Sequence, residues 1–474
     1  MKQKYSTLIS LFLIVLSILP AFLQAQETHR VSENGRPPNV IILLADDLGY
    51  GDLSCYGSQS IETPHIDALA ASGTRFTRFY AGSAVCTPSR ACLLTGKFPL
   101  RFDIRRHFSD VAGRCLPVSA TTLPELLKTA GYATAHIGKW HLGGLLPGDY
   151  EARMAGETAR PGPLQHGFDH YLCNMEGPLR QVLLRERRLY REGGHSMIRD
   201  DQRLPPDDRH WTDIKIDEAI RMLEDWKDDE QPFFLNLWFD VPHTPYEPAP
   251  EPHLSKYAKL GVTGDQLYFR SMVSHLDANI GRLIARLKEM GLYENTLIIF
   301  TSDNGPAFQG SPGPFRGGKT DLHEGGLRVP MIAVWPGHIP DHAYSFQTGH
   351  MADLLPTICE ATGITQLPSG LDGISLLEHL TTGKLLEPER ILTWQMDLYK
   401  QFQNQGPKPK PFATSVALKG RWKLLADSLQ PTEVFDLEAD HRELKSQLGK
   451  HPEIEEELLE ALKAFHAAPR NTGL

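Results

Sequence analysis

The sequence predicts an α/β protein with a large mixed, mostly parallel β-sheet sandwiched by helices, followed by a smaller C-terminal α+β subdomain. Its 474 residues exceed what one ordinary hydrophobic core accommodates. Patterns of buried strands alternate with helix patterns through most of the chain, and near Asp372 they give way to shorter strand-like runs. We therefore expect an N-terminal domain over residues 36–370 and a C-terminal subdomain over residues 371–474.

Four apolar runs have the length and composition of buried parallel strands. They cover residues 40–44, 134–137, 233–239 and 297–301. The polar residues that closely follow these runs are Asp46 and Asp47, then Lys139 and His141, then His243, and finally Asp303 and Asn304. Because ligands of open α/β sheets bind beyond the carboxyl ends of the strands, we expect these side chains to converge on one site.

Helix signals lie between the strand runs. Thr63 is placed to cap a helix that has Pro64 in its first turn and Gly73 at its end, and a second helix pattern covers residues 123–130. A longer helix that ends at Gly291 carries its apolar face on Leu276, Ile280, Leu283 and Leu287. This alternation predicts a sheet covered by helices on both faces.

The C-terminal part has a different pattern. Residues 415–419 and 422–425 have the composition of short strands, and residues 452–466 form a terminal helix pattern. The segment 405–411 is rich in proline and lysine, which predicts an exposed loop.

The first residues have the organisation of a signal peptide. Lys2 and Lys4 precede an apolar run over residues 8–19, and a small residue follows at Ala25. The alternative, a membrane anchor, needs a run long enough to cross about 30 Å of hydrocarbon, and this run is too short. We therefore expect residues 1–25 to be a signal peptide and the protein to be exported, periplasmic or secreted, without a stable membrane anchor.

Charge and cysteine content exclude some classes of function. The formal net charge of -9 argues against a general affinity for nucleic acid or anionic lipid, which require a cationic surface. The six cysteines are too few for a disulfide framework in an exported chain of this length. A small anionic substrate would need a local positive pocket.

The segment from Cys86 to Gly96 reads CTPSRACLLTG and leads from a polar loop into a short helix. Backbone N–H groups at the start of such a helix face an anion held near Cys86. A buried structural cysteine is one alternative. A thiolate phosphatase is another, but that loop has its arginine where this chain has Cys92, so Arg90 is at the wrong offset.

This segment resembles the signature of the formylglycine-dependent (type I) sulfatases of the alkaline phosphatase superfamily, and it meets every fixed position. The likeness continues to Pro330, and more weakly to the sequence EVFDLEAD that begins at Glu433. The resemblance implies an alkaline-phosphatase-like fold and hydrolysis of sulfate monoesters. It also implies that a formylglycine-generating or anaerobic sulfatase-maturating enzyme oxidises Cys86 to formylglycine.

Two acidic pairs, Asp46 with Asp47 and Asp303 with Asn304, offer an all-oxygen ligand set that suits calcium or magnesium rather than zinc. Each pair alone is also a common turn sequence. By the resemblance, these four residues and modified Cys86 hold one Ca²⁺. Related two-zinc phosphatases tend to have a histidine in place of Asn304.

The resemblance also assigns the remaining site residues. It implies that Arg90 and Lys139 stabilise the sulfate, that His141 takes a proton from the hydrated aldehyde, and that His243 and Lys319 assist the leaving oxygen. A lone histidine is more often structural than catalytic, but these two follow strand ends. Other charged residues lie near Lys319 in the sequence. We expect structural roles for Glu324 and Arg328, whereas His323 could be either structural or catalytic.

Two rival functions remain open at this point. A phosphate or phosphonate monoester hydrolase of the same superfamily can share the machinery, and a catalytically silent glycan-binding protein can share the scaffold. We expect the substrate to be a sulfated carbohydrate, such as a polysaccharide or mucin-type glycan. The basic run Arg180, Arg185, Arg187 and Arg188 could face an anionic chain or solvent.

Overall fold

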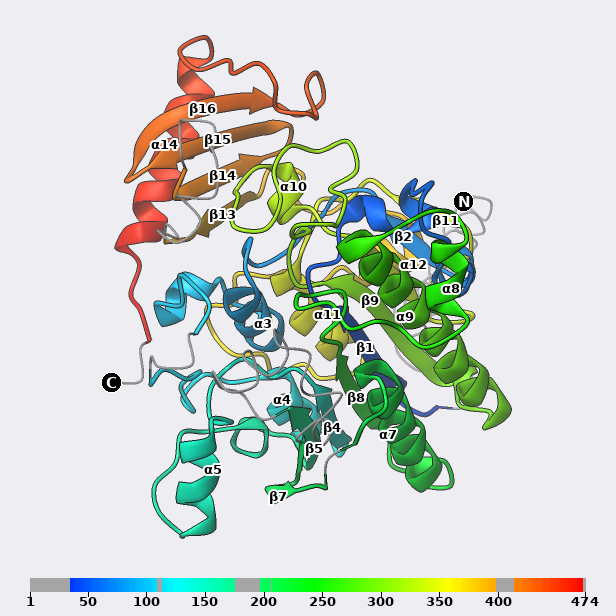
Figure 1. Ribbon diagram of the computed structural model, residues 1–474. Coiled ribbons are helices and arrows are strands. Elements are labelled where there is room, and N and C mark those ends of the chain that lie inside the picture. Colours follow the sequence, from blue (N-terminus) through cyan, green and yellow to red (C-terminus); the bar gives the residue numbers. More distant parts are fainter. Residues whose placement is uncertain (1–34, 109–112, 175–196, 206, 398–412, 472–474) are drawn as a thin grey trace, which may run out of the picture.

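The computed structural model describes residues 35–108, 113–174, 197–205, 207–397 and 413–471 (Figure 1). Within these ranges one ten-stranded sheet runs in the order β11-β2-β10-β9-β1-β8-β4-β5-β6-β7. Its strands are β1 (Asn39–Ala45), β2 (Thr74–Phe76), β4 (Ala133–Gly138), β5 (His170–Asn174), β6 (Met197–Arg199), β7 (Gln202–Arg203), β8 (Phe233–Trp238), β9 (Thr296–Ser302), β10 (Met331–Val334) and β11 (Ala343–Ser345).

The five strands from β9 to β5 are mutually parallel and form the centre of the sheet. Antiparallel pairings lie outside them, between β10 and both β9 and β2, and between β6 and both β5 and β7. Every residue of β1, β8 and β9 is buried. Burial on both faces explains why these strands are continuous apolar runs rather than alternating ones.

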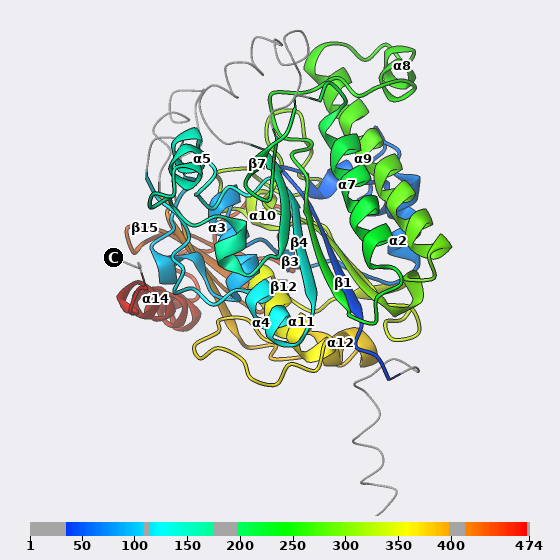
Figure 2. The same ribbon diagram turned by 90° about the horizontal axis from the view of Figure 1, so that it is seen from below.

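Helices cover both faces of the sheet (Figure 2). The helices before the C-terminal sheet are α2 (Pro64–Ala71), α3 (Cys86–Thr95), α4 (Leu123–Thr129), α5 (Pro147–Met154), α7 (Trp211–Trp226), α8 (His253–Ala258), α9 (Gly264–Glu289), α10 (Glu324–Leu327), α11 (Leu354–Ala361) and α12 (Leu377–Thr382). One apolar core joins Ile41 and Leu43 of β1 to α2, α7 and α9. The opposite core joins Val40 and Ile42 to α3, α4 and α11.

Two smaller sheets complete the described chain. A parallel pair consists of β3 (Phe79–Tyr80) and β12 (Gly349–His350). An antiparallel sheet consists of β13 (Ile391–Gln395), β14 (Ser415–Lys419), β15 (Trp422–Asp427) and β16 (Gln430–Asp436), and α14 (Pro452–Ala467) packs on it (Figure 1). The predicted fold class is therefore confirmed: a large, mostly parallel sheet between helices and a separate small C-terminal sheet.

Most predicted elements are present with small changes of boundary. The four predicted central strands are β1, β4, β8 and β9, and the predicted long helix is α9, which begins at Gly264. The prediction for Thr63 was wrong in two respects. The helix ends at Ala71 rather than at Gly73, and the Thr63 hydroxyl accepts a hydrogen bond from Ser54 N at 3.0 Å instead of capping the helix.

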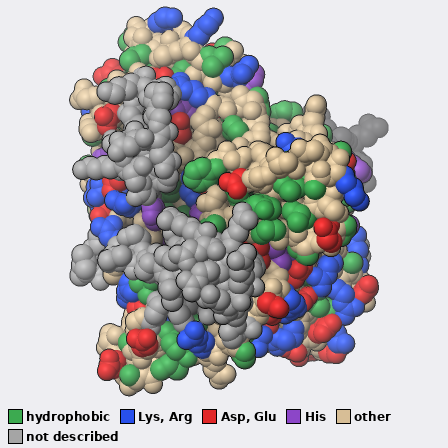
Figure 3. Space-filling model, in the orientation of Figure 1, with side chains coloured by type: hydrophobic (Ala, Val, Ile, Leu, Met, Phe, Trp, Pro, Cys, Tyr) green, Lys and Arg blue, Asp and Glu red, His purple; other side chains and the backbone are tan. Residues whose placement is uncertain are grey.

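Several predictions concern other segments. The proposed signal peptide, the loop at 405–411 and the basic run at 180–188 lie outside the described residues. No helix of the described residues is both long and apolar enough to cross a membrane. No disulfide bond joins any two of the six cysteines. On the face seen in Figure 3, acidic and basic side chains are mixed over α7 and α9.

A buried charge network joins the C-terminal sheet to the main domain. Lys423 of β15 is fully buried, and its Nζ lies 3.0 Å from Glu324 Oε1 and 2.9 Å from Glu443 Oε1. Glu324 begins α10, and its backbone N–H donates to Glu443 Oε2 at 2.6 Å. Tyr80 donates to the same Glu324 carboxylate at 2.9 Å. One cation thus compensates two carboxylates that come from different parts of the chain.

We predict that Lys423→Ala lowers the free energy of unfolding by about 3–5 kcal/mol, because it leaves the buried Glu443 carboxylate without its cation and removes one cation from Glu324, which keeps its pair with Arg328. The change is to be measured by urea denaturation. Lys463→Ala is the matched control, since Lys463 pairs with Glu460 on the solvent face of α14. That control should change stability by no more than about 0.5 kcal/mol. Equal effects of the two substitutions would contradict the role given to Lys423.

Candidate active site

Backbone hydrogen bonds, independent of the side chains, align the ends of the central strands. Asp46 N donates to Val241 O at 3.1 Å, Asp303 N to Ala45 O at 3.1 Å, and Lys139 N to Trp238 O at 3.0 Å. These bonds continue the ladders between neighbouring strands by one residue. The polar residues that follow β1, β4, β8 and β9 consequently lie at one edge of the sheet, as the sequence predicts.

The two acidic pairs face each other across β1 and β9. Asp47 N donates to Asp303 Oδ1 at 3.2 Å, and Asn304 Nδ2 donates to Asp47 Oδ1 at 2.8 Å. Asp47 has a φ of 63°, a left-handed backbone that turns its carboxylate back toward β9. All four side chains are buried, with at most 2 % of Asp46, Asp47, Asp303 or Asn304 exposed.

These residues have the chemistry of a site for a hard cation. Asp46 Oδ1 and Asn304 Oδ1 are buried acceptors that have no hydrogen-bond partner among the described residues. A buried acceptor left in that state costs free energy, and a cation would remove the cost. Ligand atoms of Asp46, Asp47 and His243 all lie within 4.8 Å of one another. The oxygen donors fit Ca²⁺ or Mg²⁺.

Three cations surround the three carboxylates of this site. Arg90 is fully buried; its Nη2 lies 2.7 Å from Asp303 Oδ2, and its Nη1 donates to Lys139 O at 3.0 Å. Lys139 Nζ lies 2.6 Å from Asp46 Oδ2, and Lys319 Nζ lies 2.8 Å from Asp47. The formal charges of these six side chains cancel. A divalent ion added to them would make the site positive.

The cations also set the ionisation of the carboxylates. Burial raises the pKa of Asp46, but the nearby Lys139 ammonium and three further cationic or basic groups outweigh burial and leave that pKa well below its usual value. Burial and the neighbouring Asp46 raise the pKa of Asp303, and Arg90 opposes them. We treat Asp303 as a carboxylate, because both Nε and Nη2 of Arg90 donate to its Oδ2.

His243 and Lys319 respond in opposite directions to the same surroundings. Burial, followed by the charge of Lys319, lowers the pKa of His243 to about 4. Burial also opposes the charge on Lys319, but Asp47 and other nearby negative groups outweigh it and raise the Lys319 pKa. At neutral pH the free site therefore holds a neutral imidazole beside an ammonium group. His243 Nε2 is 3.6 Å from Asp47 Oδ2.

Cys86 is the first residue of α3 and is 3 % exposed. It lies close enough to Arg90, Asp303 and Lys319 to contribute to the electrostatics of each. The ten residues of α3 direct the positive end of the helix dipole toward this position. Gly96 ends the helix with a φ of 64°, a conformation that favours glycine.

The segment 316–324, which carries Lys319 and is called the Lys319 segment below, is attached through its backbone to two parts of the site. Lys319 N donates to Pro306 O at 2.8 Å, and Thr320 N donates to Ala84 O at 2.8 Å. The first bond reaches the loop that follows Asn304, and the second reaches the residues just before Cys86. The position of Lys319 thus depends on both.

His141 is held by backbone and side-chain groups. Its Nε2 lies 3.1 Å from Phe108 O, and the Thr87 hydroxyl donates to His141 O at 3.0 Å. Because a carbonyl oxygen only accepts, Nε2 carries the ring proton and the lone pair is on Nδ1. The structure thus places His141 against Thr87, the neighbour of Cys86 in α3, while direct contacts join Asp46, Asp47, Arg90, Lys139, His243, Asp303, Asn304 and Lys319.

His107 is a neighbour of the site that sequence reasoning missed. Its ring centre lies 6.2 Å from that of His141. Burial, then the nearby His141 and Lys319, lowers the pKa of His107 to about 3. The only signal in the sequence was the Arg106–His107 pair shortly after the signature helix, and that pair has no characteristic spacing to the strand ends.

The remaining charged residues near Lys319 make structural contacts. His323 Nδ1 lies 2.5 Å from Asp321 Oδ1, and its Nε2 lies 2.9 Å from Glu433 Oε2. Arg328 Nε donates to Thr77 O at 2.8 Å, and its Nη1 pairs with Glu324 at 3.2 Å. Both ring nitrogens of His323 are therefore directed at carboxylates outside the acidic pairs.

Comparison with known proteins gives consistent matches. The sequence model of the family described as Sulfatase matches residues 38–364, and the model described as N-sulphoglucosamine sulphohydrolase, C-terminal, matches residues 318–468. The N-acetylgalactosamine-6-sulfatase of Sus scrofa is 35% identical over 376 residues, which cover 74% of this chain and 67% of that protein. Arylsulfatase A of Homo sapiens is 32% identical over 465 residues, covering 90% and 87%.

A solved structure extends the similarity to the whole described fold. The structure of Ps i-CgsB in complex with k-i-k-neocarrahexaose has a TM-score of 0.79 and 25% sequence identity. The similarity covers 92% of this chain and 94% of that one.

We predict that the stability lost on His323→Gln depends on pH. Burial disfavours the charged ring of His323, but hydrogen bonds to Asp321 and Glu433 outweigh burial and raise its pKa to about 9. Because the folded pKa of His323 is raised, its ion pairs stabilise the folded state fully below the unfolded pKa of about 6.5. This stabilisation is lost as the pH rises to about 9. The gap in unfolding free energy between wild type and His323→Gln should therefore shrink by up to about 3 kcal/mol across that interval.

Urea denaturation at a series of pH values measures this gap. In a Glu433→Gln background one partner of the ring is absent, so the shrinkage should be smaller and should end at lower pH. A gap that stays constant from pH 6 to 9.5 would contradict the ion pairs described for His323.

Proposed function

The chain belongs to the sulfatase family and is a sulfuric ester hydrolase, and we propose that it removes sulfate from sulfated carbohydrates by means of formylglycine made from Cys86. One observation carries the proposal. Cys86 begins a helix beside Arg90, Lys139 and Lys319, at the edge of the sheet where two acidic pairs meet. This arrangement supports nucleophilic attack on an anionic ester.

Ca²⁺ is the metal that we assign to the acidic pairs. Asp46, Asp47, Asp303 and Asn304 would hold the ion, and modified Cys86 would complete the set. When bound, Ca²⁺ supplies positive charge that polarises the sulfate group. The two orphaned acceptors, Asp46 Oδ1 and Asn304 Oδ1, support this assignment, and the absence of a histidine from the four positions argues against zinc there.

The aldehyde of formylglycine, when hydrated, supplies both an attacking hydroxyl and a second hydroxyl through which sulfate is later released. A formylglycine-generating or anaerobic sulfatase-maturating enzyme would act on Cys86 before α3 folds, because Cys86 is buried in the folded chain. We infer from the leader-like N-terminus that the mature enzyme is exported.

Arg90, Lys139 and Lys319 stabilise the sulfate oxygens and the negative charge that develops on the leaving oxygen. Lys319 lies on the same side as His243, since both contact Asp47. His243 donates a proton to the leaving ester oxygen, which departs as the alcohol. In the free site the charge of Lys319 disfavours the protonated ring, but a sulfate ester placed between the two residues adds negative charge and favours protonation.

His141 removes the proton from the second hydroxyl. The hydrogen bond from its Nε2 to Phe108 O leaves the lone pair on Nδ1, which makes Nδ1 the basic atom. Thr87 connects the two partners, because its hydroxyl donates to His141 O and accepts a hydrogen bond from Phe108 N at 3.1 Å. The signature segment thereby orients the base as well as carrying the nucleophile.

Two comparisons support a carbohydrate substrate. A relative that is 35% identical is named for N-acetylgalactosamine 6-sulfate chemistry, and a similar solved structure contains a neocarrahexaose. Matched aryl sulfate and aryl phosphate substrates, followed by defined sulfated saccharides, test the proposal. We expect turnover of the aryl sulfate and release of sulfate from at least one saccharide. Faster turnover of the aryl phosphate would overturn it.

We predict that Cys86→Ala abolishes sulfate release, because alanine cannot form the aldehyde. Sulfate is to be quantified by ion chromatography, and peptide mass spectrometry of the active wild type should show the aldehyde at position 86. Cys115→Ser is the matched control: Cys115 is a half-buried thiol, and its substitution should preserve activity. Full activity of Cys86→Ala, or an unmodified thiol in fully active enzyme, would contradict the mechanism.

We also predict that removal of calcium with a chelator abolishes activity and that added Ca²⁺ restores it. Asn304→Ala should weaken Ca²⁺ binding, measured by calorimetry, because it removes an oxygen ligand and leaves three carboxylates around the ion. Asn295→Ala is the control, since Asn295 lies beyond the opposite end of β9 and donates to Pro37 O. Activity that persists in metal-free enzyme would exclude the assigned role of the acidic pairs.

A further inference from the structure

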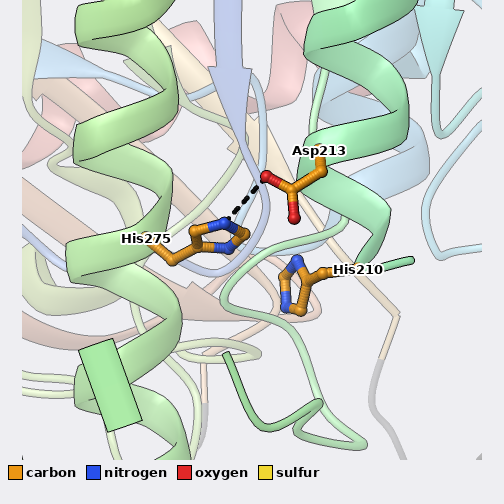
Figure 4. Close-up of side chains that lie close together, drawn as sticks. All are labelled: His210, Asp213 and His275. Atoms are coloured by element: carbon orange, nitrogen blue, oxygen red, sulfur yellow. Dashed lines mark hydrogen bonds and ion pairs between the residues drawn. The ribbon is translucent and has the colours of Figure 1, made fainter. Parts of the chain in front are cut away.

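A second group of metal-binding side chains lies outside the active site, between α7 and α9. Figure 4 shows His210, which precedes α7, Asp213 in the first turn of α7, and His275 of α9 directed at one another. Each residue offers one ligand atom, and these atoms all lie within 4.8 Å of one another. His210 and His275 are buried, at 6 % and 4 % exposed.

The three side chains are already close together. His275 Nε2 lies 2.9 Å from Asp213 Oδ1, and the ring centres of His210 and His275 are 4.6 Å apart. Ligand atoms at about 2.0–2.2 Å from a tetrahedral zinc ion are about 3.3–3.6 Å apart, so His275 and Asp213 would separate slightly to admit the ion. The Asp213 side chain is 24 % exposed, so an ion can enter from its side.

Two further residues lie beside the group. Glu247, in the segment after β8, is 4 % exposed, and its Oε2 lies 3.6 Å from His210 Nε2, whereas His210 Nδ1 accepts a hydrogen bond from Thr212 N at 3.2 Å. Asn279 Nδ2 contacts both Asp213 Oδ1 at 3.0 Å and His275 Nε2 at 2.9 Å, so it would have to move aside to admit an ion. Two histidines and one carboxylate form a donor set that favours a first-row transition metal over calcium, and Glu247 can serve as an outer partner of His210.

The local charge also allows a divalent ion. Asp213 and Glu247 together neutralise its charge. Arg282 Nη1 lies 3.8 Å from Asp213 Oδ1, but the same guanidinium pairs with Asp217 at 2.7 Å, so part of its charge is directed elsewhere. His253, whose ring centre is 5.1 Å from that of His275, adds no fixed charge when neutral.

We propose that His210, Asp213 and His275 form a zinc-binding site that is separate from the active site, with Glu247 as an outer partner of His210. The ion would replace the hydrogen bond between His275 and Asp213, and the proton of the neutral His275 ring would then lie on Nδ1. It would join the start of α7 to α9, two elements that pack on one apolar core. The site would therefore stabilise the half of the molecule that carries His243.

Zinc binding to the full-length, calcium-saturated enzyme tests the proposal. We expect calorimetry with ZnCl₂ to show one equivalent of Zn²⁺ bound, and thermal unfolding to occur at higher temperature with Zn²⁺ than without. Co²⁺ in place of Zn²⁺ should give d–d absorption bands typical of histidine and carboxylate ligands, which an all-oxygen calcium site does not give.

Two ligand variants make the test specific. His275→Gln removes one nitrogen ligand, and Asp213→Asn keeps the shape of the side chain while removing its charge. Each should weaken Zn²⁺ binding by about 100-fold or more, since loss of even an outer partner of a metal ligand costs about 10–100-fold. His170→Gln is the control: His170 also pairs with an aspartate, Asp200 at 3.2 Å, but on the surface, and no third ligand group joins this pair in the part of the chain that the structure describes.

The outcomes separate a metal site from a hydrogen-bonded cluster. Unchanged Zn²⁺ affinity in both ligand variants, or no Zn²⁺ binding by the wild type, would mean that the residues form hydrogen bonds only and would overturn the proposal. Asp213→Asn leaves the side-chain volume unchanged, so it still tests the site if the His275→Gln variant does not fold. The calcium-dependent release of sulfate is measured separately, so failure of the zinc site leaves the proposed function untouched.

Discussion

Three carboxylates buried at one edge of the sheet are the constraint on which the rest of this structure depends. Asp46, Asp47 and Asp303 would repel one another if they were left alone in a medium that excludes water. Arg90, Lys139 and Lys319 supply the compensating charge, each from a different segment of the chain. The site can therefore form only when α3, the end of β4 and the segment around Lys319 are all in place, which couples the chemistry to the tertiary fold.

The C-terminal sheet helps to position one of these cations, because it contacts the segment that carries Lys319. Five residues after that lysine, α10 begins at Glu324, whose carboxylate is fixed by Lys423 of β15 and whose N–H is fixed by Glu443. Arg316, at the other end of the segment, pairs with Glu433 at 3.0 Å. Both ends of the Lys319 segment are thus anchored on the C-terminal sheet and the turn that follows it. A rearrangement there would move Lys319 relative to Asp47, although neither residue belongs to the small sheet.

The sequence predicted the central strands and the polar residues at their ends because both are local signals. A strand buried on both faces is a continuous apolar run, and the carboxyl ends of neighbouring parallel strands must meet. The Thr63 side chain and the Lys423 network depend instead on partners that no local pattern identifies. Lys423 and Glu324 are 99 residues apart, and Ser54 competes with the helix for the Thr63 hydroxyl. His107 was missed for the same reason, since it meets His141 only through the folded loop.

The charge of the whole chain and the charge of its site act in opposite directions on an anionic substrate. A protein with net charge -9 gives no general attraction to a sulfated polymer at long range. The six charged side chains of the site cancel, so the divalent ion that we propose would supply the net positive charge that attracts an anion at short range. Under that proposal, recognition of sulfate would depend on the occupied metal site, and choice among sugars would depend on residues farther out. This separation explains why the strand ends identify the reaction while the sequence leaves the sugar open.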